Sequence, residues 1–138
     1  MSLIQELLAT PRNLSAASKY TAMNGVLYLA AGALLMAWPG ATQALFPERA
    51  FVGDEQSLIR ILGMTVAVIG WLYLFGGRSG GRQIVAATVA DRLLLVPAVL
   101  VPLAAAGVFP HLLMTFAILD PALAAGAWIL LGRTTVPR

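Results

Sequence analysis

The sequence predicts an all-α fold: a bundle of four transmembrane helices that follows a short N-terminal amphipathic segment. Of the 138 residues, 59% are hydrophobic and only 11% are charged, whereas a soluble domain has about 25% charged residues. The mean hydropathy is +0.84. A soluble chain of this length buries only about two-thirds of its unfolded surface, which would leave a large apolar surface in water. Four long apolar stretches, each close to the ~20 residues that cross a bilayer, indicate that lipid is the solvent instead.

The N-terminal region, residues 1–22, is predicted to lie at the membrane interface. It contains apolar residues at helical spacing, which is typical of an amphipathic segment. These residues are Leu3, Ile4, Leu7 and Leu8. No cleavable signal peptide is expected, because the start lacks a basic region and the long apolar run begins only after residue 23. The first span would then act as an uncleaved signal anchor.

The transmembrane domain is predicted over residues 23–138. The first span has no charged residue at its centre, and Trp38 and Pro39 close it as an interfacial aromatic residue and a helix stop. A polar loop separates it from the second span, a glycine-rich turn follows the second, and a short turn with His111 follows the third. The expected spans are residues 23–45, 58–76, 83–106 and 112–131.

The distribution of lysine and arginine predicts the orientation of these spans. Three regions that share one side of a four-span topology contain Arg12, Lys19, Arg78, Arg82, Arg133 and Arg138. The loops on the other side have only Arg49, surrounded by Glu48, Asp54 and Glu55. The positive-inside rule therefore predicts a multi-pass protein of the bacterial inner membrane with both termini in the cytoplasm.

Several classes of function are excluded by composition. The chain has no cysteine and one histidine, His111, so thiolate sites, iron–sulfur clusters, an all-histidine metal centre and bis-histidine haem are not expected. The nine basic residues are scattered singly, which argues against a nucleic-acid partner. No catalytic motif can be assembled from one histidine and six acids. We therefore expect neither an enzyme nor a cofactor or metal.

Four ionisable residues within the spans are the candidate functional residues, because charge in hydrocarbon is costly. They are Arg60, Asp91, Arg92 and Asp120. At ~1.5 Å per helical residue, Asp91 and Arg92 lie roughly 10–13 Å from the cytoplasmic end, Asp120 roughly 16 Å and Arg60 roughly 22–24 Å. These depths predict a ladder of paired charges in the bundle interior, which would serve as a binding or proton site.

Two structural interpretations of the same residues stay open. Paired charges also simply hold helices together, and intramembrane polar contacts contribute modestly to stability. Arg60 and Arg92 are long enough to extend toward the two interfaces. The span prolines Pro97, Pro102 and Pro121 either open a midplane cavity by kinking their helices or are ordinary residues of membrane helices.

Glycines in the first two spans predict close helix packing. Gly25 and Gly32, and likewise Gly63 and Gly70, are seven residues apart, so each pair lies on one helix face and lets another backbone approach. Four aromatic residues are either pocket-lining or belong to interfacial and packing groups. These are Tyr28, Trp71, Tyr73 and Trp128.

Part of the chain resembles DoxX-like membrane proteins, a group of small bacterial four-span proteins. The resemblance covers roughly residues 58–131 and rests on Arg60-Ile61-Leu62-Gly63, Gly70-Trp71-Leu72-Tyr73, Asp91-Arg92 and Asp120-Pro121. It implies the four-helix fold and no particular reaction. Without cysteine, a thiol-redox role is not expected.

Three functions remain as hypotheses. The first is a non-enzymatic binding or assembly protein whose bundle contacts another membrane component, either a copy of itself or a larger complex. The second is a small oligomeric carrier or exporter that uses Asp91 or Asp120 as a proton or cation site. The third, a membrane-embedded enzyme or a quinone- or haem-binding subunit, is disfavoured by the scarcity of histidine and acids.

Overall fold

The computed structural model describes residues 2–133, which form helices and no strand. Four of the helical stretches are long and apolar enough to cross a membrane: Ala16–Ala37, Glu55–Arg78, Arg82–Ala105 and Pro110–Arg133. This confirms the all-α, four-helix prediction. The elements are α1 (Leu3–Leu8), α2 (Ala16–Ala37), α3 (Ala41–Leu45), α4 (Glu55–Arg78), α5 (Arg82–Ala90), the π-helical turn η1 (Asp91–Leu95), α6 (Val96–Ala105) and α7 (Pro110–Arg133).

The helix of the first span differs at both ends from the predicted range 23–45, because α2 runs from Ala16 to Ala37. Ser15 caps it by accepting a hydrogen bond from the Ser18 amide (3.1 Å). Three polar residues in its first half are buried inside the bundle, so the apolar run begins later than the helix does. They are Ser18, Thr21 and Asn24. At the other end Pro39 cannot donate a backbone hydrogen bond, and the chain turns into the short helix α3.

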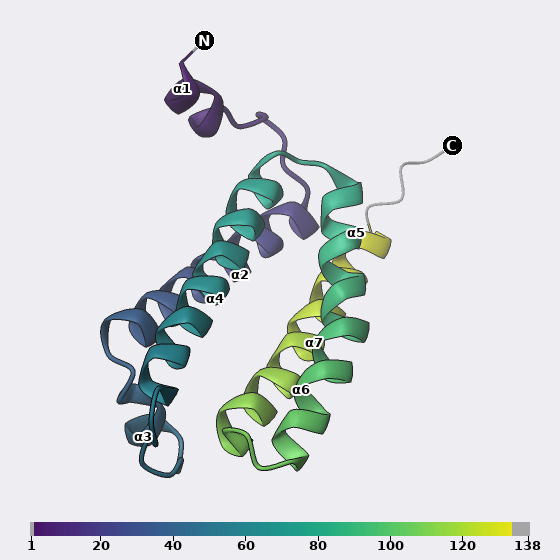
Figure 1. The fold of residues 1–138 in the computed structure, drawn as a ribbon. Helices are drawn as coiled ribbons and strands as arrows, with labels where there is room; N and C mark the ends of the chain where they lie inside the picture. The colour runs from purple at the N-terminus through teal and green to yellow at the C-terminus, as the bar shows by residue number, and fades with distance from the viewer. Residues whose placement is uncertain (1, 134–138) are drawn as a thin grey trace.

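The two ends of the bundle differ in composition. We call them the α1 end, which contains α1 and the α4–α5 turn, and the α3 end, which contains α3 and the α6–α7 turn (Figure 1). Within residues 2–133, the α1 end has five basic residues: Arg12, Lys19, Arg78, Arg82 and Arg133. Arg138, used above to predict orientation, lies outside the described residues. Arg78 ties α1 to this end by donating to the Leu8 carbonyl (3.3 Å) and to Thr10 Oγ1 (2.8 Å).

The helices pack as two pairs, α2 with α4 and the α5–η1–α6 stretch with α7 (Figure 1). Contacts of α2 with α7 and of α4 with α5 join the pairs. Helices α4 and α6 do not form a closely packed pair. As a result, the four helices do not close around a single axis, and one face of the bundle stays open between α4 and α6.

Glycine determines the close contact between α2 and α4. A Cβ added to Gly25 would lie 2.6 Å from the Gly70 carbonyl oxygen, and one added to Gly63 would lie 2.8 Å from that of Gly32. Both distances are shorter than any real side chain tolerates, so the backbones touch because these positions have no side chain. The four glycines lie inside one chain and are buried, so they serve the fold of the monomer.

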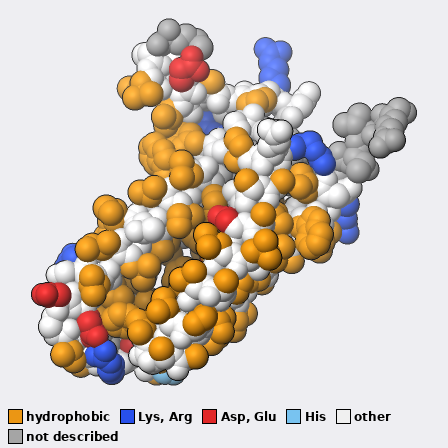
Figure 2. Space-filling view, turned by 45° about the vertical axis from the view of Figure 1, so that its right-hand side comes forward, with side chains coloured by type: hydrophobic (Ala, Val, Ile, Leu, Met, Phe, Trp, Pro, Cys, Tyr) orange, Lys and Arg blue, Asp and Glu red, His pale blue; other side chains and the backbone are white. Residues whose placement is uncertain are grey.

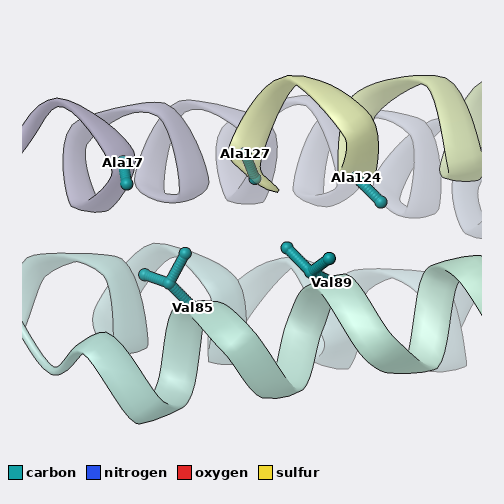
Figure 3. Close-up of a cluster of buried hydrophobic side chains, with 5 residues drawn as sticks. All are labelled: Ala17, Val85, Val89, Ala124 and Ala127. Carbon is teal, nitrogen blue, oxygen red and sulfur yellow. The ribbon is translucent and has the colours of Figure 1, made fainter. Parts of the chain in front are cut away.

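Small side chains join the second pair to α2 near the α1 end (Figure 3). Val85 and Val89 of α5 point toward Ala124 and Ala127 of α7, and Ala17 of α2 completes this buried cluster. Alanine on two helices lets the valines fill the space between them. The cluster fixes α5, and with it η1, against α2 and α7.

Glu48 anchors α7 at the α3 end. Its side chain is almost fully buried, and its Oε1 accepts a hydrogen bond from the Leu112 amide (2.7 Å), near the first turn of α7. The first amides of a helix have no partner within the helix, and its N-terminus favours negative charge. The other carboxylate oxygen lies 3.7 Å from His111 Nδ1. The loop before α4 is thus bound to α7.

We expect Glu48→Ala to lower the free energy of unfolding by about 1–2 kcal/mol, because it leaves the Leu112 amide without its acceptor. Glu48→Gln keeps an acceptor oxygen and is expected to lose less than half of that amount. Unfolding by sodium dodecyl sulfate in mixed micelles, followed by circular dichroism, measures both. Equal stability of Glu48→Ala and the unchanged protein would contradict this role.

Candidate functional site

Arg92 is the central buried charge of the bundle and has no exposed surface. It lies in η1, and its Nε donates to the carbonyl oxygen of Thr88 one turn earlier (2.8 Å). Its Nη2 donates to Thr88 Oγ1 (3.3 Å). The guanidinium also lies over the Tyr73 ring, 4.9 Å from the ring centre, an arrangement that stabilises a desolvated cation. Arg92 therefore points into the bundle and does not extend to the interface.

Tyr73 of α4 links Arg92 to Asp91. Its hydroxyl donates to Asp91 Oδ2 (3.0 Å), while its ring faces the Arg92 guanidinium. Tyr73 also makes an edge-on contact with Tyr28, with ring centres 5.5 Å apart. The three side chains combine one acid and one base around a phenol, so the group has no net charge when both are ionised.

The predicted ladder of four paired charges is not present. Within residues 2–133, no ion pair within 4.0 Å joins any two of Arg60, Asp91, Arg92 and Asp120. Arg60 is exposed and donates to the Met36 carbonyl. The last carbonyls of α2 have no partner within the helix, and a long side chain from the start of α4 reaches them before it reaches the interior. Arg92 in turn finds acceptors on its own helix.

Asp120 of α7 is the buried acid without a partner. Its side chain is 6% exposed and forms neither a hydrogen bond nor an ion pair with any residue of the described segment 2–133. Its Oδ1 atom is fully buried. Pro121 follows directly. Because proline has no backbone N–H, a carbonyl of the preceding turn lacks its usual hydrogen-bond donor. A carboxyl group in hydrocarbon without a partner is costly.

Asp120 lines a cavity of about 300 Å³ between the two helix pairs. Leu95 and Val99 on one side and Thr65 on the other are exposed, so the cavity opens between α4 and α6. Figure 2 shows this part of the molecule covered by hydrophobic side chains and hollowed near its centre. Tyr28 and Phe116 also line a smaller cavity of about 160 Å³. The remaining lining residues of the larger cavity are Leu62, Val66, Ile69, Val96, Leu100 and Leu113.

The π-helical turn η1 determines which residues line this cavity from the third span. The Val96 amide donates to the Asp91 carbonyl, five residues back, where an α-helix would use a residue four back. Pro97 follows, and its ring would crowd the Leu93 carbonyl in a regular helix. The widened turn relieves this crowding. It places Asp91 and Arg92 toward Tyr73, and Val96 and Val99 toward the cavity.

Sequence reasoning missed several polar residues of the interior. Thr21 and Asn24 lie on α2, two turns and one turn before Tyr28, and the three side chains share the buried face. Their spacing along one helix face was the available signal, since exposed polar residues rarely keep to such a stripe within an apolar stretch. Buried polar atoms without a hydrogen-bond partner are Thr21 Oγ1, Asn24 Nδ2, Tyr28 OH, Asp91 Oδ1, Arg92 Nη1 and Asp120 Oδ1.

The aromatic candidates separate into two groups. Tyr28 is a pocket residue, as one interpretation of the sequence proposed, and Tyr73 is buried beside it. Trp71 and Trp128 are about half or more exposed on the outer surface. Among residues 2–133, no three His, Asp or Glu side chains come close enough to hold a metal ion.

No family model, curated protein or solved structure matches the chain. The resemblance to DoxX-like proteins therefore stays a prediction.

Proposed function

We propose that the protein is a non-enzymatic binding protein of the membrane that takes an amphipathic molecule from the bilayer into the cavity between α4 and α6. The observation behind this proposal is the pairing of an apolar lining with two buried polar groups that have no partner. These groups are the Tyr28 hydroxyl and the Asp120 carboxyl. A ligand with one polar end would satisfy both.

The position of the opening supports entry from the lipid. Both helices at the mouth, α4 and α6, are membrane-crossing stretches, and the exposed side chains there are mostly apolar. A lipid-like molecule dissolved in the bilayer would reach such a mouth without crossing a polar surface. Ligand pockets usually have volumes of about 300–1,000 Å³ and apolar walls with a few polar groups, and this cavity lies at the lower end of that range.

Saturable binding of tritiated octan-1-ol to the protein in phosphatidylcholine nanodiscs tests the proposal. Val99 lines the mouth of the cavity, whereas Val101 is an exposed valine on the same helix that does not line it. We expect Val99→Trp to fill the mouth and to reduce binding by about tenfold or more. Val101→Trp is the matched control and is expected to bind like the unchanged protein. Equal binding by both variants, or no saturable binding at all, would exclude the cavity as the site.

A second candidate is a small oligomeric proton-coupled carrier, favoured by one observation: Asp120 is unpaired and lies at the cavity. Asp91, the other acid considered from the sequence, accepts a hydrogen bond from Tyr73 and is less available. Uptake of tritiated tetraethylammonium into proteoliposomes under an imposed pH gradient tests this candidate. Gradient-driven uptake that Asp120→Asn abolishes would favour it, and absence of such uptake would leave binding as the function.

We further propose that the protein is inserted in the bacterial inner membrane with the α1 end in the cytoplasm. The five described basic residues of that end support this orientation, as does α1, whose exposed Leu3, Ile4 and Leu8 suit an interfacial position.

The orientation is testable because the chain has no cysteine of its own. Ala50 and Ser79 are exposed residues at opposite ends. In spheroplasts, a membrane-impermeant maleimide is expected to label Ala50→Cys, and to label Ser79→Cys only after the membrane is permeabilised. The reverse labelling pattern would show that the α1 end faces outward.

A further inference from the structure

The charge distribution around the cavity restricts the chemistry of its ligand. The two basic residues within the apolar spans have partners other than Asp120: Arg92 contacts Thr88 and Tyr73, and Arg60 donates to the Met36 carbonyl. No basic side chain of residues 2–133 forms an ion pair with Asp120. On α7 itself the next basic residue is Arg133, at the far end of the helix.

Asp91 and Arg92 leave no charge for Asp120 to use. They are consecutive residues joined through Tyr73, and together they are neutral. Asp120 therefore differs from Asp91 in that no basic side chain of residues 2–133 pairs with it or shares a partner with it. In a low-dielectric site, an ionised carboxylate without a counter-ion takes up a proton or attracts a cation.

The rest of the cavity suits the apolar part of such a cation. Nine of its twelve lining residues are neither charged nor hydroxyl-bearing, and the other three are Tyr28, Thr65 and Asp120. Thr65 already donates to the Ile61 carbonyl (3.0 Å). The rings of Tyr28 and Phe116 line the same cavity as Asp120, and aromatic faces attract cations. The Tyr28 hydroxyl, without a partner, is free to accept a hydrogen bond from an ammonium group.

We propose that the ligand is an amphipathic amine, with its ammonium group on Asp120 and Tyr28 and its hydrocarbon body between α4 and α6. This inference rests on the proposed function and names its ligand class. A quaternary ammonium would use the charge and the ring faces alone, whereas a primary amine would also donate hydrogen bonds to both oxygens.

The test compares octylamine, which is protonated at neutral pH, with octan-1-ol, which has the same chain and a neutral head. Saturable binding of both tritiated probes is measured in phosphatidylcholine nanodiscs, whose lipid has no net charge. The unchanged protein is expected to prefer the amine by about tenfold or more, as charged hydrogen bonds are stronger than neutral ones. Asp120→Asn is expected to lose the preference, so that the ratio of the octylamine affinity to the octan-1-ol affinity falls toward one, and Asp120→Glu is expected to retain the preference in part.

The outcomes separate this inference from the function on which it rests. Saturable binding of octan-1-ol without preference for octylamine would overturn the amine and leave the cavity as a binding site for neutral molecules. A preference that persists in Asp120→Asn would also overturn it. Failure of both probes to bind would overturn the proposed function together with the inference. If Asp120→Asn does not fold, Tyr28→Phe removes the second acceptor and is expected to lower the preference for octylamine.

Discussion

Replacing Gly70 by leucine is expected to prevent the pairing of α2 with α4 and to leave little folded protein. A Cβ at this position would already lie 2.7 Å from the Gly25 carbonyl oxygen and 2.9 Å from the Tyr28 carbonyl carbon. These are backbone atoms, which cannot move aside as a flexible side chain does. Because α2 and α4 form the most extensive helix contact of the bundle, its loss removes the support of the remaining helices.

A graded series makes the effect of Gly70 measurable. Gly70→Ala is expected to lower the free energy of unfolding by about 1–3 kcal/mol, the usual cost of overpacking. Gly132→Ala serves as the control, because an added Cβ there meets no atom within 4 Å, and no loss of stability is expected. Titration with sodium dodecyl sulfate, followed by circular dichroism, gives each value. If the Gly70→Leu protein were as stable as the unchanged chain, the backbones of α2 and α4 would not approach each other closely at Gly70.

Replacing Arg92 by methionine is expected to lower the free energy of unfolding by about 3–5 kcal/mol. Methionine fills much of the same volume but leaves the half-buried Asp91 without the cation with which it shares Tyr73, and an unbalanced charge in the interior is costly. It also removes the cation from the Tyr73 ring and the two hydrogen bonds to Thr88. The same titration measures the change.

Two further variants identify the origin of that loss. Arg92→Met combined with Asp91→Asn removes both charges, and we expect it to be more stable than Arg92→Met alone, so that the two effects are not additive. Arg60→Met makes the same substitution at an exposed position with one hydrogen bond to Met36, and about 1 kcal/mol or less is expected. If Arg60→Met is as harmful as Arg92→Met, the buried position of Arg92 is not the cause.

Hydropathy predicted the number and type of the membrane-length helices because four long, predominantly apolar stretches leave no alternative in lipid. It misplaced the first span because Ser18, Thr21 and Asn24 are polar residues turned inward, where neighbours rather than lipid surround them. A scale that sums residues along the chain does not distinguish inward from outward faces. The second, third and fourth spans have few such residues near their ends, and their expected bounds differ from the structure by only a few residues.

The sequence predicted which residues belong to the candidate site, but it did not predict which side chains they contact. Asp91, Arg92 and Asp120 are indeed buried or partly buried, as the cost of charge in hydrocarbon implies. Depth along the membrane normal placed Arg92 and Asp120 within reach of each other, yet depth contains no information on the direction of a side chain around its helix. Tyr73 and Thr88 are the actual partners of Arg92. Thr88 lies one turn earlier in the same span, whereas the contact with Tyr73 comes from helix packing that no single stretch reveals.

The η1 turn has one more residue than a regular α-helical turn, and each residue rotates the following chain by about 100° around the helix axis. Every side chain from Val96 to Ala105 is thereby presented one position out of phase with those of α5. Deletion of a single leucine from this turn would hardly change the composition of the span. It would, however, rotate α6 about its axis, so that a different set of its side chains would face α4. The set of residues that lines the cavity from the third span thus depends on the number of residues in η1, and we expect an insertion or deletion there to change this lining more than any single substitution in α6.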